Sequence, residues 1–209
     1  MIAEYDSMLK LMKERRSIRR FQQRQVPKRF IEMLVEAARW APTAGNHQNY
    51  RLLSITRTET IGILADVVHQ EIHRIMELIR EDFREQVDRY TTNFLIFARA
   101  PLLMIPIYRQ GPNLLNALCG REIVDEEDSR REAYSSVSAA IMNLLLAAQS
   151  LGLGACWMTG PLIAEKTISE IIEVPSGWRI SALIPIGFPD ESPPLPGRKT
   201  AAMLLKQLD

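Results

Sequence analysis

The sequence predicts one α+β domain, residues 1–209, with a small mixed or antiparallel sheet flanked by helices. Helix-like and strand-like patterns interleave along the chain. Only about four strand-like runs occur, however, and none is followed by the glycine-rich phosphate turn of a doubly wound fold. With 46% hydrophobic and 24% charged residues, the chain can bury one large core and does not have the composition of a disordered protein.

The N-terminal half is mainly helical in pattern. Apolar residues at helical spacing behind the capping residue Asp6 predict a short first helix. A second helix is expected to start at Pro27, a favoured first helical position, and to end near Pro42. A turn-forming stretch and a β-leaning run, residues 51–57, follow. Residues 60–87 return to a helical pattern, which predicts two helices or one bent helix.

The C-terminal half alternates apolar runs with turns. A nearly all-apolar run at residues 102–107 predicts a strand buried on both faces. Residues 130–151 predict a long helix that is buried all round, because its second half carries few charges. Residues 110–129 have the composition of a loop. The other expected elements are strands at residues 155–159 and 179–187, a helix at residues 163–172, and a proline-rich extended arm after Gly187.

Charge is distributed unevenly along the chain. The whole sequence has 26 Lys+Arg and 25 Asp+Glu, a formal charge of +1. Residues 13–29, the basic segment, hold eight basic residues and one acid, so this segment carries +7 and the rest of the chain −6. Such a segment predicts that an anion binds near the N-terminal end. A solvated basic face and a nucleic-acid site are the alternatives. Few neighbouring aromatic residues and no recognisable binding motif argue against nucleic acid.

Several catalytic motifs are absent from the sequence. His69 and His73 lie four residues apart on an expected helix, but Gln70 stands where an HExxH general base is required, and no metal site is predicted. The GLG sequence at residues 152–154 lacks the third glycine of a dinucleotide fingerprint, because Trp157 occupies that position. It is typical of a helix C-cap and a tight turn. No Walker loop and no GxSxG elbow occur.

Targeting and redox signals are also missing. The first ten residues lack the basic-then-apolar pattern of a secretion signal. The most apolar long stretch, residues 137–157, is interrupted by polar residues and glycines, which favours a buried helix over a membrane span. Cys119 and Cys156 lie far apart and form no CxxC pair, so neither a disulfide framework nor a zinc site is indicated. We therefore expect a cytoplasmic protein.

Two polar stretches are candidates for ligand binding. In an extended chain, Arg15, Ser17 and Arg19 would project to the same side of the basic segment. Guanidinium forks together with a hydroxyl suit a phosphate group. The second stretch, residues 43–49, is rich in Asn and Gln, whose amides can read the hydrogen-bonding edge of a heterocycle. A plain turn is the alternative interpretation of this loop.

These motifs, in this order, resemble those of the flavin-dependent nitroreductase family, and the resemblance spans nearly the whole chain. The family's Arg-x-Ser-x-Arg/Lys-x-Phe motif is matched by RRSIRRF at residues 15–21. The further matches are APTAGNHQ at residues 41–48, the helix and Gly-Leu-Gly turn within residues 143–160, SGWR at 176–179, IPIGFP at 184–189, and Arg198 with Lys199. Pro196 departs from the pattern, since the family often has Lys there.

The resemblance implies a nitroreductase-like fold and a homodimer that binds FMN noncovalently at the subunit interface, with two sites per dimer. The redox chemistry belongs to the flavin, so the resemblance implies no catalytic side chain and no metal. The implied FMN-binding residues form three sets. They are Arg15, Arg16, Ser17, Arg19 and Arg198 for the phosphate and ribityl chain; Pro42, Thr43, Ala44, Asn46 and Gln48 from the partner subunit; and Trp157, Met158, Thr159 and Gly160 along the isoalloxazine ring.

We therefore predict an NAD(P)H oxidoreductase of nitroreductase type that reduces nitroaromatics, quinones or a related acceptor in a ping-pong scheme. The alternative is a flavoenzyme of the same fold with another reaction, such as a reductive dehalogenase, a flavin-fragmenting synthase or a dehydrogenase. Residues 110–128 are expected to cover the substrate. A nucleic-acid or anion-binding module without flavin is the third hypothesis, and it predicts salt-sensitive DNA or RNA binding.

Overall fold

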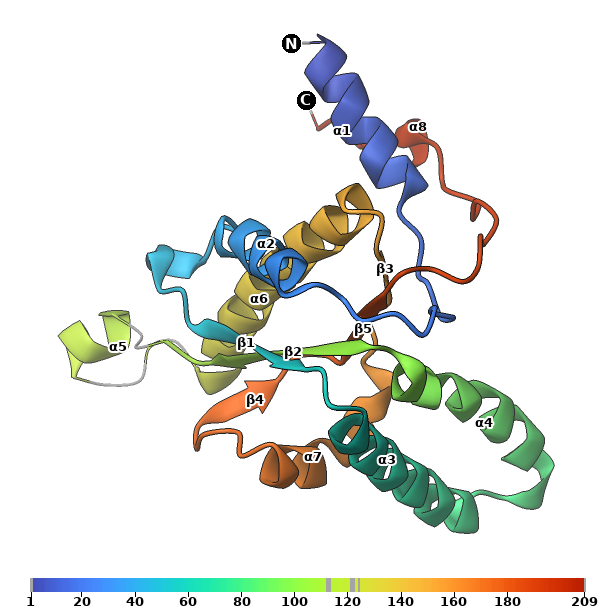
Figure 1. The fold of residues 1–209 in the computed structure, drawn as a ribbon. Helices are drawn as coiled ribbons and strands as arrows, with labels where there is room; N and C mark the ends of the chain where they lie inside the picture. Colours follow the sequence, from blue (N-terminus) through green and yellow to red (C-terminus); the bar gives the residue numbers. More distant parts are fainter. Residues whose placement is uncertain (1, 112–113, 121–122, 124, 209) are drawn as a thin grey trace.

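The computed structural model describes residues 2–111, 114–120, 123 and 125–208. Within these residues the chain forms an antiparallel sheet of five strands in the order β1-β2-β5-β3, with β4 also paired to β2 (Figure 1). The strands are β1 (Tyr50–Ile55), β2 (Leu102–Arg109), β3 (Gly154–Ala155), β4 (Trp178–Ile180) and β5 (Ile184–Gly187). The predicted α+β class, with a small antiparallel sheet flanked by helices, is confirmed.

Strand β2 lies at the centre of the sheet and separates two cores. Successive side chains of a strand point to opposite faces. Leu102 and Met104 therefore belong to one cluster of buried apolar residues, whereas Leu103 and Ile105 belong to the other. All but the last residue of β2 are buried, which confirms the prediction of a strand buried on both faces.

Helices cover both faces of the sheet. α2 (Lys28–Arg39) and α6 (Glu126–Ser150) pack on one face, and α3 (Thr58–Leu78), the 3-10 helix η3 (Thr92–Arg99) and α7 (Glu165–Ile171) pack on the other (Figure 1). The predicted helical pattern at residues 60–87 forms two helices, α3 and α4. The remaining helices are α1 (Ile2–Glu14), α4 (Arg84–Thr91), α5 (Leu114–Cys119), α8 (Ala201–Leu204) and the short 3-10 helices η1 (Ala44–Asn46), η2 (Glu81–Phe83) and η4 (Gly160–Ala164).

The C-terminal strand predictions require correction. Residues 179–187 form two strands, β4 and β5, whose ladders with β2 differ in register by one residue. Pro106 of β2 lies at the junction and has no N–H to donate, and its carbonyl accepts the N–H of Ser181 (2.8 Å). Neither ladder therefore continues past this point. The strand predicted at residues 155–159 is also shorter, because β3 covers only Gly154–Ala155.

Two predictions about residues 110–151 were also wrong. Residues 110–129, expected to be a loop, contain α5 and the first turn of α6. α6 follows Asp125, whose carboxylate accepts the N–H of Asp128 (2.7 Å). Its acidic first turn resembles a loop in composition but suits the positive end of the helix dipole. α6 is not buried all round either, because Ser135 and Met142 are exposed.

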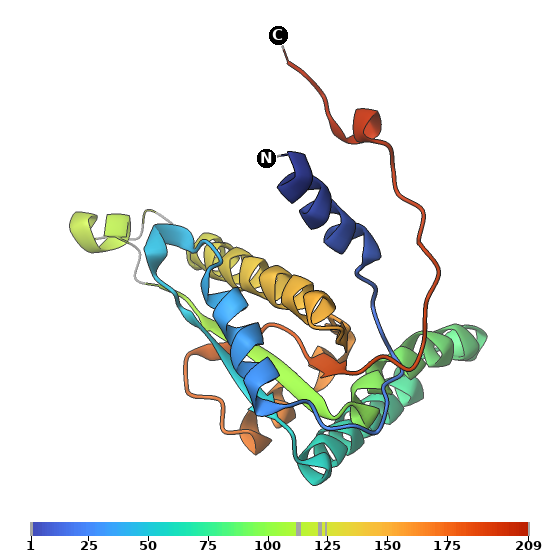
Figure 2. The same cartoon turned by 45° about the horizontal axis from the view of Figure 1, so that its top comes forward.

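The two ends of the chain project from the body. α1 has no buried residue, and the predicted arm after Gly187 runs extended to α8 on the same side of the molecule (Figures 1 and 2). Ile2, Tyr5, Leu195 and Leu208 are at least 58% exposed in these segments. Groups of exposed apolar side chains commonly mark protein contact surfaces. None of the described helices is long and apolar enough to cross a membrane.

Candidate functional site

The basic segment leaves α1 and runs extended along the edge of the sheet. Ser17 forms an isolated parallel bridge with Ala155 of β3, and the N–H of Ile18 donates to the Ala155 carbonyl (3.0 Å). Ile18 and Phe21 are buried, and they anchor the segment from inside. A Cβ on Gly154 would lie 2.6 Å from the Cβ of Ile18. This close approach requires glycine at that position.

This bridge brings the basic segment beside the residues that follow β3. Burial raises the pKa of the Cys156 thiol, and the nearby positive charge of Arg19, a hydrogen bond with Ser17 and the charge of Arg15 partly oppose the rise. All three side chains therefore lie near Cys156. The structure thus brings Arg15, Ser17 and Arg19 close to the residue that precedes the stretch at residues 157–160.

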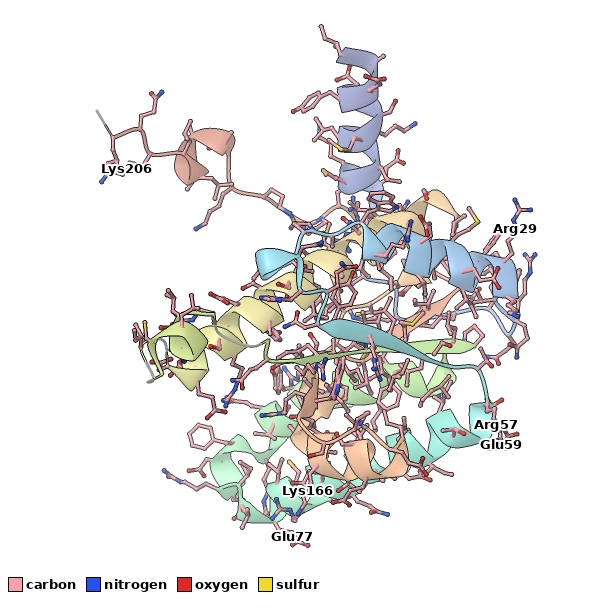
Figure 3. All side chains as sticks on the ribbon, turned by 90° about the vertical axis from the view of Figure 1, so that its left-hand side faces the viewer. Arg29, Arg57, Glu59, Glu77, Lys166 and Lys206 are labelled. Atoms are coloured by element: carbon pink, nitrogen blue, oxygen red, sulfur yellow. The ribbon has the colours of Figure 1, made fainter. Side chains whose placement is uncertain are left out.

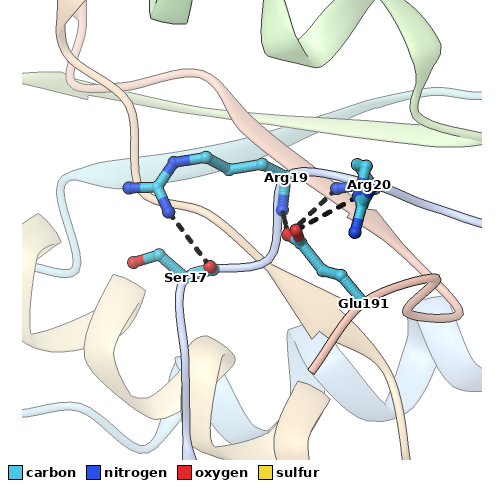
Figure 4. A network of polar contacts seen from close by, with 4 residues as sticks. All are labelled: Ser17, Arg19, Arg20 and Glu191. Carbon is cyan, nitrogen blue, oxygen red and sulfur yellow. Dashed lines mark hydrogen bonds and ion pairs between the residues drawn. The ribbon is translucent and has the colours of Figure 1, made fainter. Parts of the chain in front are cut away.

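The arginines of this region have unused hydrogen-bonding capacity. The Nε atom of Arg15 is buried and has no hydrogen-bond partner among the described residues. A buried charged donor without a partner costs free energy, and such an atom calls for an explanation. The Arg19 guanidinium contacts only the Ser17 carbonyl, at 3.4 Å (Figure 4), in the part of the chain that the structure covers. Both observations point to a site for an anion.

Three other basic residues of the basic segment have different surroundings in the protomer. Arg24 stacks on the ring of Phe188, with 3.9 Å between the guanidinium carbon and the ring centroid. Arg29 points away from the body, like the other labelled charged side chains in Figure 3. Arg16 lines a separate cavity of about 340 Å³ near the C-terminal end of α6, together with Gln149. Local charge alone therefore overstates the number of arginines that face one ligand.

Glu191 is a functional candidate that sequence reasoning missed. Its carboxylate comes from the C-terminal arm and accepts the consecutive backbone N–H groups of Arg19 and Arg20, while the Arg20 guanidinium pairs with it at 3.4 Å (Figure 4). Burial raises the pKa of Glu191, but these hydrogen bonds and the Arg20 charge together outweigh burial and lower it. No local pattern links an acid in the arm to arginines about 170 residues earlier.

The stretch at residues 157–160 is held rigidly by its neighbours. Met158 exchanges both backbone hydrogen bonds with Leu183, at 3.1 and 2.9 Å. Trp157 is half-buried, whereas Thr159 is exposed. Gly160 lies against Phe94, and a Cβ there would stand 2.3 Å from the Phe94 ring. These contacts fix the backbone conformation of this stretch.

The third set of residues, in the loop at residues 42–48, lies elsewhere in the protomer. The Ala44 N–H donates to the Ser136 hydroxyl on α6 (3.2 Å), and the Gln48 N–H donates to the Thr43 hydroxyl (3.1 Å). Asn46 adopts a left-handed backbone conformation, with φ of 54°. Pro42 joins Thr43 and Ala44 in lining a cavity against α6. Among the described residues, no hydrogen bond or ion pair joins this loop to the basic segment.

Arg198 also lies apart from the basic segment. It is exposed in the C-terminal arm, and its guanidinium donates to the Gly197 carbonyl (3.0 Å). Within the described residues it makes no ion pair or hydrogen bond with the basic segment. Its assignment to a phosphate site remains a prediction from the resemblance.

A cavity of about 1140 Å³ lies between the basic segment, α3 and η3. Arg19 is part of its wall, and His69 and His73 line it from α3. The Nε2 atoms of these two histidines are 3.2 Å apart, which fits one ring donating to the other. Across the described residues, no group of three or more His, Cys, Asp or Glu side chains could hold a metal ion.

Comparison with known proteins identifies a family and related proteins. The model of the nitroreductase family matches residues 12–188. The iodotyrosine deiodinase of Thermotoga neapolitana is 27% identical over 184 residues, which cover 88% of this chain and 89% of that protein.

Solved structures with lower sequence identity share the fold. A BluB-like flavoprotein from Clostridium difficile superposes with a TM-score of 0.85 at 23% identity, covering 97% of this chain and 99% of the other. The NADPH:FMN oxidoreductase of Vibrio harveyi, complexed with NAD⁺, gives 0.72 at 16% identity, covering 97% and 77%. Because the family model covers most of the sequence, the chain belongs to the nitroreductase family.

Proposed function

We propose that the protein is an FMN-dependent NAD(P)H oxidoreductase of nitroreductase type, built from one domain per protomer, which reduces nitroaromatic or quinone acceptors. The observation that carries the proposal is the unpartnered buried Nε of Arg15 beside Ser17 and the residue 157–160 stretch. Membership of the nitroreductase family supports the reaction type. The name of the Vibrio harveyi structural neighbour supports both FMN and a nicotinamide reductant.

The residues present fit FMN. Arg15 and Arg19 have free guanidinium donors and Ser17 has a hydroxyl, a set that suits a phosphate through charge-assisted hydrogen bonds. Arg16 and Arg198 are proposed to approach the same phosphate in the assembled protein. The backbone of Trp157, Met158, Thr159 and Gly160 would lie along the ring. Bound FMN would supply the two-electron chemistry between NAD(P)H and the acceptor.

The protein's own residues would bind and orient the ring and exclude water from it. No side-chain acid or base has to take part, which agrees with the absence of a catalytic dyad from the sequence. We therefore assign no catalytic residue. The proposed scheme is ping-pong: the oxidised nicotinamide would leave before the acceptor binds.

A homodimer would complete the site. The residue 42–48 loop meets α6 at Ser136, whereas the cavity that contains Arg16 reaches α6 at Gln149, about 20 Å further along the helix axis. If two copies pair with their α6 helices antiparallel, the loop of each copy comes near the basic segment of the other. The exposed stripe of α6 around Met142 would supply the contact. This arrangement gives two composite sites per dimer.

One experiment tests the proposal directly. The purified protein should show a flavin absorption spectrum, and NADPH should reduce it in anaerobic solution. Arg15→Gln should lose about 1.5–3 kcal/mol of FMN binding, roughly 10- to 150-fold in Kd, because it removes a charged phosphate contact. Arg24→Gln is the matched control, because Arg24 stacks on Phe188 in the same segment. A protein that stays colourless after FMN addition, or equal losses in the two variants, would refute the proposal.

A different flavin reaction is the second candidate. The 27% identity to an iodotyrosine deiodinase favours reductive dehalogenation as that alternative. The region expected to cover the substrate contains α5, which lies near the residue 42–48 end of the molecule (Figure 1). Residues 112–113, 121–122 and 124 of that region lie outside the described residues. An anaerobic panel of nitro, quinone and iodoaromatic acceptors would separate the two reactions.

A further inference from the structure

A cavity of about 710 Å³ lies between the residue 42–44 loop and α6. The loop wall is the stretch proposed to contact the flavin of the partner subunit. Because the Ala44 N–H donates to the Ser136 hydroxyl, the loop and the helix are held together. A molecule that lies over the flavin against this loop therefore also meets the polar side of α6, where Arg131, Glu132 and Ser135 line the cavity.

The charges of this cavity are not balanced. The Arg131 guanidinium lies 3.1 Å from the Asp128 carboxylate and 3.7 Å from the Glu127 carboxylate, so its charge is already paired. Glu132 lines the same cavity, and its carboxylate has no ion pair or hydrogen bond within the described part of the chain. His47 faces Glu132 only across a separate void of about 20 Å³ and is not hydrogen-bonded to it. The cavity wall thus carries one uncompensated negative charge.

We propose that Glu132 is a specificity-determining residue that favours neutral or cationic acceptors and disfavours acceptors carrying an anionic group. The inference rests on the proposed function, because this cavity meets a flavin only in the proposed homodimer. The Pro42, Thr43 and Ala44 side chains bring no positive charge to offset the carboxylate. A carboxylate on the acceptor would enter beside Glu132 and be repelled, whereas an amide of the same shape would not.

The test compares two acceptors of nearly equal size, 4-nitrobenzoate and 4-nitrobenzamide, with the FMN-loaded enzyme and NADPH. Glu132→Gln should raise kcat/KM for 4-nitrobenzoate about fivefold, the effect of one exposed charge interaction, and leave 4-nitrobenzamide within about twofold. The gain should shrink in 0.5 M salt, because screening weakens exposed charges. Arg131→Gln should act in the opposite direction and lower kcat/KM for 4-nitrobenzoate.

The matched control is Glu126→Gln. It makes the same charge change six residues earlier on α6, but Glu126 pairs with Arg130 (2.9 Å) and does not line the cavity. A second measurement avoids turnover: benzoate and benzamide, which carry no nitro group, are titrated into the oxidised enzyme while flavin absorbance is followed. Glu132→Gln should tighten the Kd of benzoate selectively.

The outcomes separate this inference from the proposed function. Equal changes for both acceptors in Glu132→Gln, or the same gain in Glu126→Gln, would show that Glu132 does not set the acceptor charge. A selective gain in both kcat/KM and benzoate Kd supports the assignment. If the wild-type protein binds no FMN, or oxidises NADPH with neither acceptor, the proposed function itself is wrong and the inference falls with it.

Discussion

Replacing Glu191 by alanine should loosen the C-terminal arm beyond Asp190, whose own N–H still donates to the Arg20 carbonyl. The Glu191 side chain is 16% exposed and accepts two backbone N–H groups, one of them at 3.1 Å from Arg20. Hydrogen bonds to a charged group contribute about 1.5–3 kcal/mol each, but solvent reaches part of this site and replaces part of that interaction. The Arg20 side chain is 73% exposed, so its ion pair adds at most about 1 kcal/mol.

We expect Glu191→Ala to cost about 2–3 kcal/mol of unfolding free energy, which lowers the melting temperature by roughly 4–12 °C in a chain of this size. Glu191→Gln should cost only about 1 kcal/mol, because the amide oxygen still accepts a hydrogen bond. Thermal unfolding measures both values. Limited proteolysis should cut the arm after Gly187 faster in the alanine variant than in the wild type.

The pH dependence of this contribution has a definite sign. Because the folded pKa of Glu191 is lowered, its stabilising effect is complete above the unfolded value, about 4.3, and is lost as the pH falls through the lower folded value. Glu85→Ala is the control, since that glutamate pairs with Arg89 but is 85% exposed. If Glu191→Ala is no less stable than Glu85→Ala, or its arm is cut no faster, Glu191 does not anchor the arm.

Two further predictions concern the supports of the site. Gly154→Ala should cost about 1–3 kcal/mol and reduce bound flavin, because the new Cβ would push Ile18 and the basic segment outward. Gly62→Ala, with no atom within 4 Å of its new Cβ, should be neutral or stabilising in melting experiments, and equal losses in both variants would contradict the steric argument. Glu165 accepts two hydrogen bonds from Arg179, both 2.8 Å, and these lower the pKa of Glu165. Its contribution to folding stability is therefore present above about pH 4.3 and is lost at lower pH. The free energy of unfolding in urea should therefore change less between pH 5 and pH 3 in Glu165→Gln than in the wild type. Equal changes in the two proteins would rule out this coupling.

Local patterns were sufficient for much of the fold. The apolar run that buries both faces of β2 and the proline-rich arm follow from neighbouring residues alone, so the sequence predicts them correctly. Predictions were wrong where a distant partner decided the outcome. The break between β4 and β5 depends on Pro106 in another strand. The start of α6, by contrast, depends on a local signal, because it is set by capping from Asp125 rather than by apolar periodicity.

For the site, local sequence is enough to identify residues whose side chains could bind a phosphate or contact a flavin. Clustered arginines beside Ser17 suit a phosphate in any fold, and the family motifs indicate a flavin. Which of these residues lie together depends on how the chain folds. The tertiary structure brings the basic segment to the stretch after β3, leaves Arg15 Nε without a partner among the described residues, and adds Glu191 from the arm. These contacts join residues far apart in sequence, and their energies depend on burial and geometry that no local pattern encodes.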